Sequence, residues 1–141
     1  MIITLCGGGS TFPPGIVKSI ALRKDELDVD EIRLYDINEE RQRKIGVLVD
    51  WIQEAYGKFD GIVMNPAAYT HTSVALLDAL KAVSLPAAEV HLSNIYDRED
   101  FRHISYPGKA CVKTVYGKGF AGYEEAICFL KNYIQERKET R

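Results

Sequence analysis

Short apolar runs alternate along this chain with longer segments in which apolar residues recur at the helical period. The apolar runs that predict strands are residues 2–5, 31–35, 61–64, 87–90 and 110–116. The helical pattern covers residues 14–24, 38–55, 72–83 and 123–137. Strands separated by helices of roughly 10–20 residues predict a parallel sheet with helices on both faces. We therefore expect an α/β fold, a three-layer α/β/α sandwich whose five strands follow the flavodoxin-like order 2-1-3-4-5.

The size and composition fit one compact domain spanning residues 1–141. A formal net charge of -2 gives no electrostatic attraction to nucleic acid or to an anionic membrane. The longest apolar run, Ile127 to Leu130, is far too short to cross a membrane, and the N-terminus lacks the features of a signal peptide. Three widely spaced cysteines favour buried thiols in a reduced, cytoplasmic protein over disulfides or a metal site.

Polar side chains follow the third and fourth predicted strands, where this fold places ligands. Asn65 comes directly after residues 61–64, His71 lies in the next connection, and His91 and Ser93 follow the fourth strand. The ends of neighbouring strands lie about 4.8 Å apart, so Asn65 and His91 are expected to face one pocket. Glu89 is two residues before His91, on the same face of its strand, and is expected to orient the imidazole.

Arg98 and Arg102 are four residues apart on a predicted helical stretch, which would give fixed positive charge for a carboxylate ligand. Each polar residue also has a purely structural explanation. A histidine can be a satisfied polar residue at a strand end, Asn-Pro is a common turn, and the arginines can form solvated ion pairs with Glu99 and Asp100. Residue chemistry alone therefore suggests a pocket for a small polyhydroxy acid, with His91 as proton donor or acceptor.

Four segments resemble the type II 3-dehydroquinate dehydratases, over about residues 46–137. They are DGIVMNPAAYTHTSVALLDA at 60–79, EVHLSN at 89–94, REDFRHISY at 98–106 and GKGFAGY at 117–123. The resemblance implies trans elimination of water from 3-dehydroquinate through an enolate, a step of the shikimate pathway. It implies that His91 donates a proton to the departing hydroxyl, that Asn65 binds the ring and a water that stabilises the enolate, and that His71 and Arg102 contact ring hydroxyls.

The same resemblance implies that the Leu92–Ser93 backbone and the Ser93 hydroxyl hold the substrate carboxylate. Asp78 would reach the site of a neighbouring subunit, because the family assembles as trimers grouped into dodecamers. No metal and no organic cofactor is needed for the reaction. Leu77 stands where many relatives have arginine, which is a departure at a subunit contact.

The first 45 residues depart from that family. Its N-terminal loop carries a tyrosine that acts as general base and an arginine beside it, whereas here the strand is followed by GGGSTFPPGIVK at 7–18, with no tyrosine before Tyr35. This segment, with EIRLYDI at 31–37 and EERQRKI at 39–45, resembles the NAD-dependent family 4 glycoside hydrolases over about residues 2–45. We interpret the chain as an engineered chimera of a Rossmann-type βαβ fragment, 1–45, and a dehydratase fragment, 46–141, with little or no activity.

The alternative function is that of an NAD or nucleotide-binding module, which would use the glycine-rich loop 7–10. In the family 4 resemblance, Gly7, Gly9 and Asp36 occupy the dinucleotide-binding positions. A second glycine pattern at 117–122 does not fit a dinucleotide site, because no strand follows its helix. We assign no cofactor-binding residue with this alternative.

Overall fold

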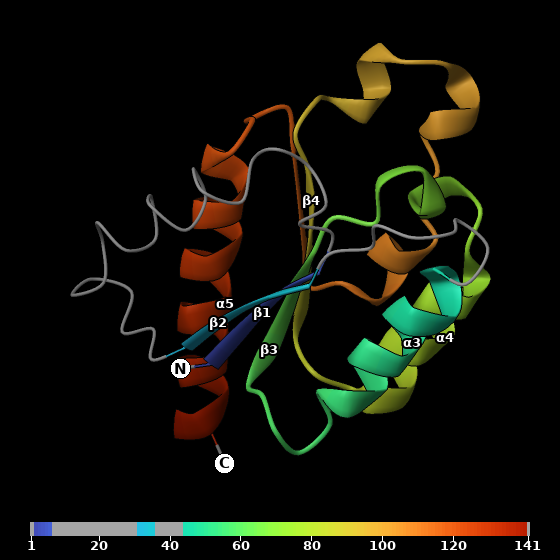
Figure 1. Ribbon diagram of the computed structural model, residues 1–141. Coiled ribbons are helices and arrows are strands. Elements are labelled where there is room, and N and C mark those ends of the chain that lie inside the picture. Colours follow the sequence, from blue (N-terminus) through green and yellow to red (C-terminus); the bar gives the residue numbers. More distant parts are fainter. Residues whose placement is uncertain (1, 7–30, 36–43, 141) are drawn as a thin grey trace.

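The computed structural model describes residues 2–6, 31–35 and 44–140 of the chain. Its sheet contains five parallel strands: β1 (Ile2–Cys6), β2 (Glu31–Tyr35), β3 (Gly61–Met64), β4 (Ala87–His91) and β5 (Lys113–Tyr116). The strands lie in the order β2-β1-β3-β4-β5, as the alternation of strand and helix patterns predicts (Figure 1). This register brings the ends of β3 and β4 side by side, with Met64 opposite Glu89.

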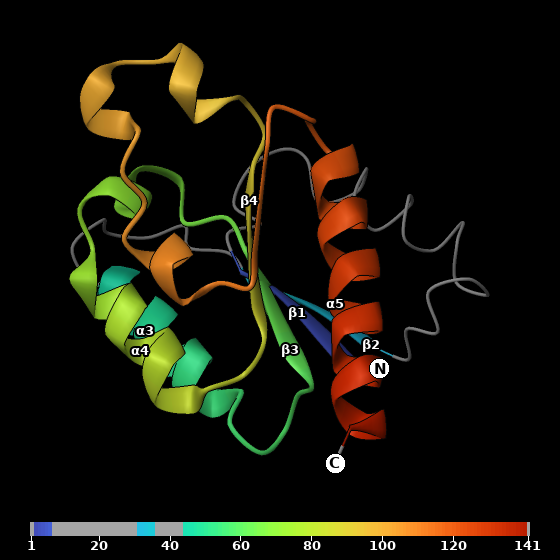
Figure 2. The same ribbon diagram turned by 180° about the vertical axis from the view of Figure 1, so that it is seen from behind.

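The described helices cover the two faces of this sheet. Helices α3 (Lys44–Glu54) and α4 (Val74–Val83) pack on one face, and α5 (Ala121–Glu139) packs on the other, as both views show (Figures 1 and 2). The expected α/β fold with helices on both faces is thus confirmed for this part of the chain.

The core follows the period of two that strands impose on their side chains. On β3, Val63 belongs to the cluster under α5, while Ile62 and Met64 belong to the cluster under α3 and α4. All four residues of β3 and all five of β4 are buried, because helices cover both faces of a parallel sheet. Burying each large apolar side chain of this kind stabilises the fold by about 1.5–3 kcal/mol.

Four 3₁₀ turns connect these elements: η1 (Ala67–His71), η2 (Ile95–Asp97), η3 (Asp100–Arg102) and η4 (Pro107–Ala110). We call residues 95–110, which contain η2, η3 and η4, the cap segment; η2 and η3 extend beyond the end of β4 in Figure 1, and η4 packs against α4. The Tyr106 N–H donates to the Thr70 carbonyl at 2.9 Å, which ties the cap segment to η1. Tyr96 packs edge-on against Tyr116 of β5, with ring centroids 5.2 Å apart.

Some details of the elements differ from the sequence prediction. Helix α4 begins at Val74 rather than residue 72, because Ser73 adopts an extended conformation and caps the helix by accepting a hydrogen bond from the Leu76 N–H. The fifth strand begins at Lys113 rather than residue 110, since η4 uses the residues that follow Pro107. Arg98 is extended and lies outside any helix, so the predicted helical spacing of Arg98 and Arg102 is wrong.

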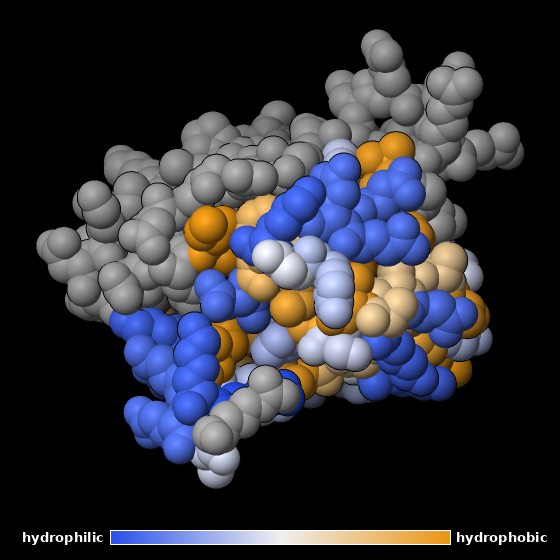
Figure 3. Space-filling view, turned by 90° about the horizontal axis from the view of Figure 1, so that it is seen from below, coloured by the Kyte–Doolittle hydropathy of each residue, from blue (hydrophilic) through white to orange (hydrophobic). Residues whose placement is uncertain are grey.

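Several predictions fall outside the described residues: the helix at 14–24, the glycine-rich loop 7–10, Asp36, and the first part of the helix expected at 38–55. No helix in the described part of the chain combines the length and the apolar character needed to cross a membrane. Seen from the end opposite the cap segment, the surface mixes hydrophilic areas with smaller apolar ones (Figure 3).

Candidate active site

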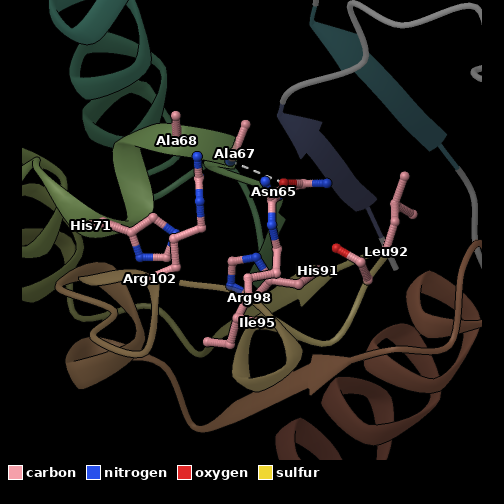
Figure 4. A pocket seen from close by; sticks show the side chains of 10 residues that line it. Asn65, Ala67, Ala68, His71, His91, Leu92, Ile95, Arg98 and Arg102 are labelled. Atoms are coloured by element: carbon pink, nitrogen blue, oxygen red, sulfur yellow. Dashed lines mark hydrogen bonds between the residues drawn. The ribbon is translucent and has the colours of Figure 1, made fainter. Parts of the chain in front are cut away.

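A pocket opens at the carboxyl ends of β3 and β4, between η1 and the cap segment (Figure 4). Its volume of about 320 Å³ lies within the range of sites that hold small molecules. The location is the one that a parallel α/β sheet reserves for ligands. The residues that line the pocket are Asn65, Ala67, Ala68, His71, His91, Leu92, Ser93, Ile95, Arg98 and Arg102.

Asn65 enters the pocket directly from β3, and its amide is fixed by a local turn. Its Oδ1 accepts a hydrogen bond from the Ala67 N–H at 3.0 Å (Figure 4). Ala67 has φ +49°, in the left-handed region that side chains with a Cβ rarely adopt. Burial raises the pKa of Tyr123, and a hydrogen bond with Asn65 acts in the opposite direction. Because Oδ1 is already an acceptor, the NH₂ of Asn65 is the group that donates to Tyr123 or to a ligand.

His91 is the last residue of β4 and is buried, with 6% of its surface exposed. Its Nε2 lies 3.1 Å from Oε1 of Glu89, which confirms the proximity predicted from their spacing. The contact is not aligned as a hydrogen bond, and Nε2 has no hydrogen-bond partner within the described part of the chain. A buried imidazole nitrogen of this kind, beside a carboxylate, is typical of functional sites.

Glu89 is a fully buried carboxylate that neutral donors hold in place beneath His91. The Ser105 hydroxyl lies 2.8 Å from each carboxylate oxygen, and the Thr70 hydroxyl lies 3.4 Å from Oε1. Ser105 in turn accepts a hydrogen bond from the Gly108 N–H at 2.9 Å. Hydrogen bonds of this kind compensate for the loss of hydration that a buried charge suffers. The cap segment thus supplies the groups that position Glu89.

His71 lines the opposite wall, at the end of η1. Its Nδ1 lies 2.8 Å from the carbonyl oxygen of Ile104. Because a carbonyl only accepts, Nδ1 carries a proton and Nε2 is the nitrogen left for a ligand. This bond also joins the cap segment to η1, beside the bond between Tyr106 and Thr70.

Two arginines give the pocket its positive charge. Arg98 and Arg102 reach from the cap segment toward Asn65 and Ala67 in Figure 4. Nε of Arg102 donates to Oε2 of Glu99 at 2.8 Å. The pKa of Glu99 lies below its ordinary value. The largest cause is a hydrogen bond from the backbone N–H of Glu99, and the next is the hydrogen bond from Arg102. The arrangement suits a ligand that combines hydroxyl groups with a negative charge.

Comparison of this chain with known proteins identifies its family. The family described as dehydroquinase class II matches residues 13–131. The chain belongs to this family.

Two dehydroquinase relatives cover most of the chain. A 3-dehydroquinate dehydratase from Acaryochloris marina is 46% identical over 125 residues, which are 86% of this chain and 84% of the relative. A catabolic 3-dehydroquinase from Phaeosphaeria nodorum is 41% identical over 133 residues, or 94% of this chain and 84% of the relative. Against the 3-dehydroquinate dehydratase of Clostridium acetobutylicum, the matched part is shorter, 64% of this chain and 63% of the relative's length.

The fold agrees with solved dehydroquinase structures. The crystal structure of a type II dehydroquinase from Butyrivibrio crossotus superposes with a TM-score of 0.78 at 36% identity, over 92% of this chain and 97% of the other. The family match begins at residue 13, inside the segment that resembles family 4 glycoside hydrolases. Most of that segment lies outside the described residues.

The glycine pattern at 117–123 has a structural role beside this pocket. Gly117 and Gly119 adopt φ of +75° and +53°, and their N–H groups donate to the carbonyls of His91 and Leu92 at 3.2 and 2.9 Å. A Cβ on Gly122 would lie only 3.2 Å from Val90. These glycines therefore let the start of α5 approach β4 and fix the backbone that presents His91 and Leu92.

Most of the predicted site residues share the pocket: Asn65, His71, His91, Leu92, Ser93 and Arg102. Asp78 does not line it and is exposed on α4. The sequence interpretation did not identify Ala67, Ala68 or Ile95 as lining residues. Their only signal is adjacency to Asn65 and Asn94 in the matched motifs. No group of three or more potential metal ligands forms among the described residues.

Proposed function

We propose that this chain carries the substrate site of a type II 3-dehydroquinate dehydratase. The reaction removes one proton and one hydroxyl of the substrate as water and leaves 3-dehydroshikimate. The proposal is supported above all by the pocket that Asn65, His71, His91, Ser93 and Arg102 share in a chain of this family. Two of its relatives are a 3-dehydroquinate dehydratase and a catabolic 3-dehydroquinase, which agrees with this substrate.

In this proposal, each side chain acts on a different part of the substrate. The Ser93 hydroxyl and the backbone of Leu92 and Ser93 hold the carboxylate, while His71 and Arg102 bind ring hydroxyls. Asn65 donates to the ring or to a water that stabilises the enolate. His91 gives a proton to the departing hydroxyl, and Glu89, whose Oε1 lies 3.1 Å from Nε2 of His91, positions the imidazole.

We further propose that turnover is slow, because the family's N-terminal tyrosine base has no counterpart before Tyr35. Loss of a general base lowers a rate by about 10²–10⁴-fold. The resemblance of residues 2–45 to another family supports an engineered chimera. Such a chimera would retain the family's proton donor, His91, and its site for the substrate carboxylate, but would lack the general base. Binding should therefore survive better than catalysis.

The test separates binding from turnover. Titration with quinate, a saturated analogue of the substrate, should perturb the amide signals of Ser93, Asn65 and Arg102 in NMR spectra. Dehydration of 3-dehydroquinate, followed by the ultraviolet absorbance of the conjugated product, should be at least a hundredfold slower than in a complete relative assayed alongside it. Turnover equal to the relative's would contradict the proposal that the chain lacks a general base. Absence of quinate-induced shifts would contradict the proposal that the pocket binds the substrate.

Other predictions remain part of this proposal. A trimeric or dodecameric assembly and a cytoplasmic location follow from the resemblance and from the cysteine pattern, and light scattering would measure the first. For the alternative of nucleotide binding, the loop 7–10 lies outside the described residues, and no observation in the described part favours it.

A further inference from the structure

Both arginines of the pocket contact the same carboxylate, that of Glu99. Nε of Arg102 lies 2.8 Å from Oε2 of Glu99, and Nε of Arg98 lies 3.7 Å from the same oxygen. The arginines line the pocket, whereas Glu99 stands outside it, with 56% of its side chain exposed. The contacts engage Nε of each guanidinium, and the terminal nitrogens extend toward Asn65 and Ala67 (Figure 4).

The local backbone builds this contact into the cap segment. The Arg102 N–H donates to the Glu99 carbonyl at 2.7 Å, and this tight turn brings the two side chains to one side of η3. The Phe101 ring lies under the guanidinium of Arg102, with 5.1 Å between Cζ and the ring centroid. Glu99 and Phe101 together fix the edge and the face of this guanidinium, so its remaining edge points into the pocket.

The charge that a ligand meets follows from this geometry. Among the described residues that line the pocket, Arg98 and Arg102 carry fixed positive charge, and the Glu99 carboxylate offsets one of these two charges. The Glu89 carboxylate does not face the rim, because it is buried behind His91 and held by Ser105. A ligand with one carboxylate balances the rim, whereas a second negative charge would meet Glu99.

We propose that Glu99 is a specificity-determining residue that sets the pocket's preference for monoanions over dianions. This inference rests on the proposed function for the place where the ligand binds, and it adds the charge class that is selected. The competing explanation is a solvated surface ion pair with no effect on binding, since exposed pairs of this kind contribute little.

The experiment uses two aromatic probes of matched size. In 3,5-dihydroxybenzoate the ring carries one carboxylate, and in 5-hydroxyisophthalate a second carboxylate replaces one hydroxyl. Dissociation constants for both are measured by NMR titration of the full chain and of Glu99→Gln. Removing one negative charge about 5–8 Å from the ligand should raise the ratio of dianion to monoanion affinity by roughly three- to tenfold. The change should shrink at high salt, because screening weakens it.

Two further variants complete the test. Glu125→Gln removes a carboxylate that also contacts two cations, Lys113 of β5 and Lys118 of the loop before α5. None of these three residues lines the pocket, so this variant should leave the ratio unchanged. Glu99→Asp keeps the charge and should keep the preference. An unchanged ratio in Glu99→Gln would overturn this inference and leave the proposed function intact. If the unaltered chain bound neither probe nor quinate in the pocket, both would be overturned.

Discussion

At the scale of single residues, the buried carboxylate of Glu89 depends on a glycine in the cap segment. A Cβ on Gly108 would lie 2.5 Å from Oε2 of Glu89 and 2.8 Å from the Ser105 hydroxyl. Glu89 is fully buried and bound by Ser105, so it has little room to shift. The carboxylate beneath His91 is therefore held by steric fit as well as by hydrogen bonds.

Gly108→Ala is expected to destabilise the fold by about 1–3 kcal/mol, the usual cost of inserting a methyl group into a packed site. The chemical denaturation midpoint would measure the change. Lys109→Ala alters the neighbouring exposed residue and should change stability by no more than about 0.5 kcal/mol. Equal stabilities of the two variants would contradict the close approach of Gly108 to Glu89.

Cys111 is predicted to be an unreactive thiol in the folded state. Burial, and next the negative charge of Glu89, raises the pKa of Cys111 to about 12 from an ordinary value of 9.0. Since the thiolate is the nucleophile, a Cys6→Ser, Cys128→Ala variant should react with iodoacetamide at pH 8 only after unfolding in urea. Rapid labelling of the folded variant would argue against this environment.

The same pKa gives the sign of a stability effect. Because the folded-state pKa lies above the ordinary value, an unfolded chain loses this proton first as the pH rises. The contribution of Cys111 should thus be complete below pH 9 and decline toward pH 12. A Cys111→Ala comparison across this range would isolate it from other titrating groups.

At the scale of elements, α4 ends on a residue in the left-handed region. Ser84 has φ +55° at the C-cap, and its N–H donates to the Leu80 carbonyl. Glycine adopts this conformation without the steric cost that a Cβ imposes. Ser84 therefore holds, at the end of α4, a backbone conformation that glycine would adopt more easily.

Ser84→Gly is expected to stabilise the fold by about 0.5–1 kcal/mol through relief of that cost. Thermal and urea unfolding would measure the gain. Ser84→Ala removes the hydroxyl, which bonds to the Lys81 carbonyl, but keeps the Cβ, so it should give no gain. A glycine variant no more stable than the alanine variant would contradict the strain argument.

At the scale of the whole molecule, Asp78 is the residue that would connect binding to assembly in the proposed function. It is exposed on α4, outside the pocket of its own chain. If it completes a neighbouring subunit's site, Asp78→Asn should weaken quinate binding about tenfold or more in the assembled protein and leave a monomer unaffected.

Lys81→Ala is the matched control, because Lys81 is also exposed and lies about one turn further along α4. Light scattering would report the assembly state of each sample before titration with quinate. An assembled Asp78→Asn variant that binds quinate as tightly as the unaltered chain would exclude a role in the neighbouring site.

The alternation of strand and helix patterns was sufficient to predict the sheet and the position of the pocket. The short apolar runs that form the strands and their spacing along the chain are local properties, so the strand order followed from the rules for parallel connections. Asn65 and His91 could be assigned to one pocket because Asn65 directly follows β3 and His91 ends the neighbouring strand β4.

The way in which the cap segment contacts the pocket could not be predicted from local patterns. Its 3₁₀ turns have no long periodicity, and the sequence wrongly suggested a helix through Arg98 and Arg102. The contacts of Ser105 and Gly108 with Glu89, and of Ile104 with His71, join residues 16 to 33 positions apart. Such contacts depend on how the chain folds back, and no local pattern encodes them. The pocket that Asn65 and His91 indicate therefore owes its shape and charge to the packing of the cap segment against η1 and the end of β4.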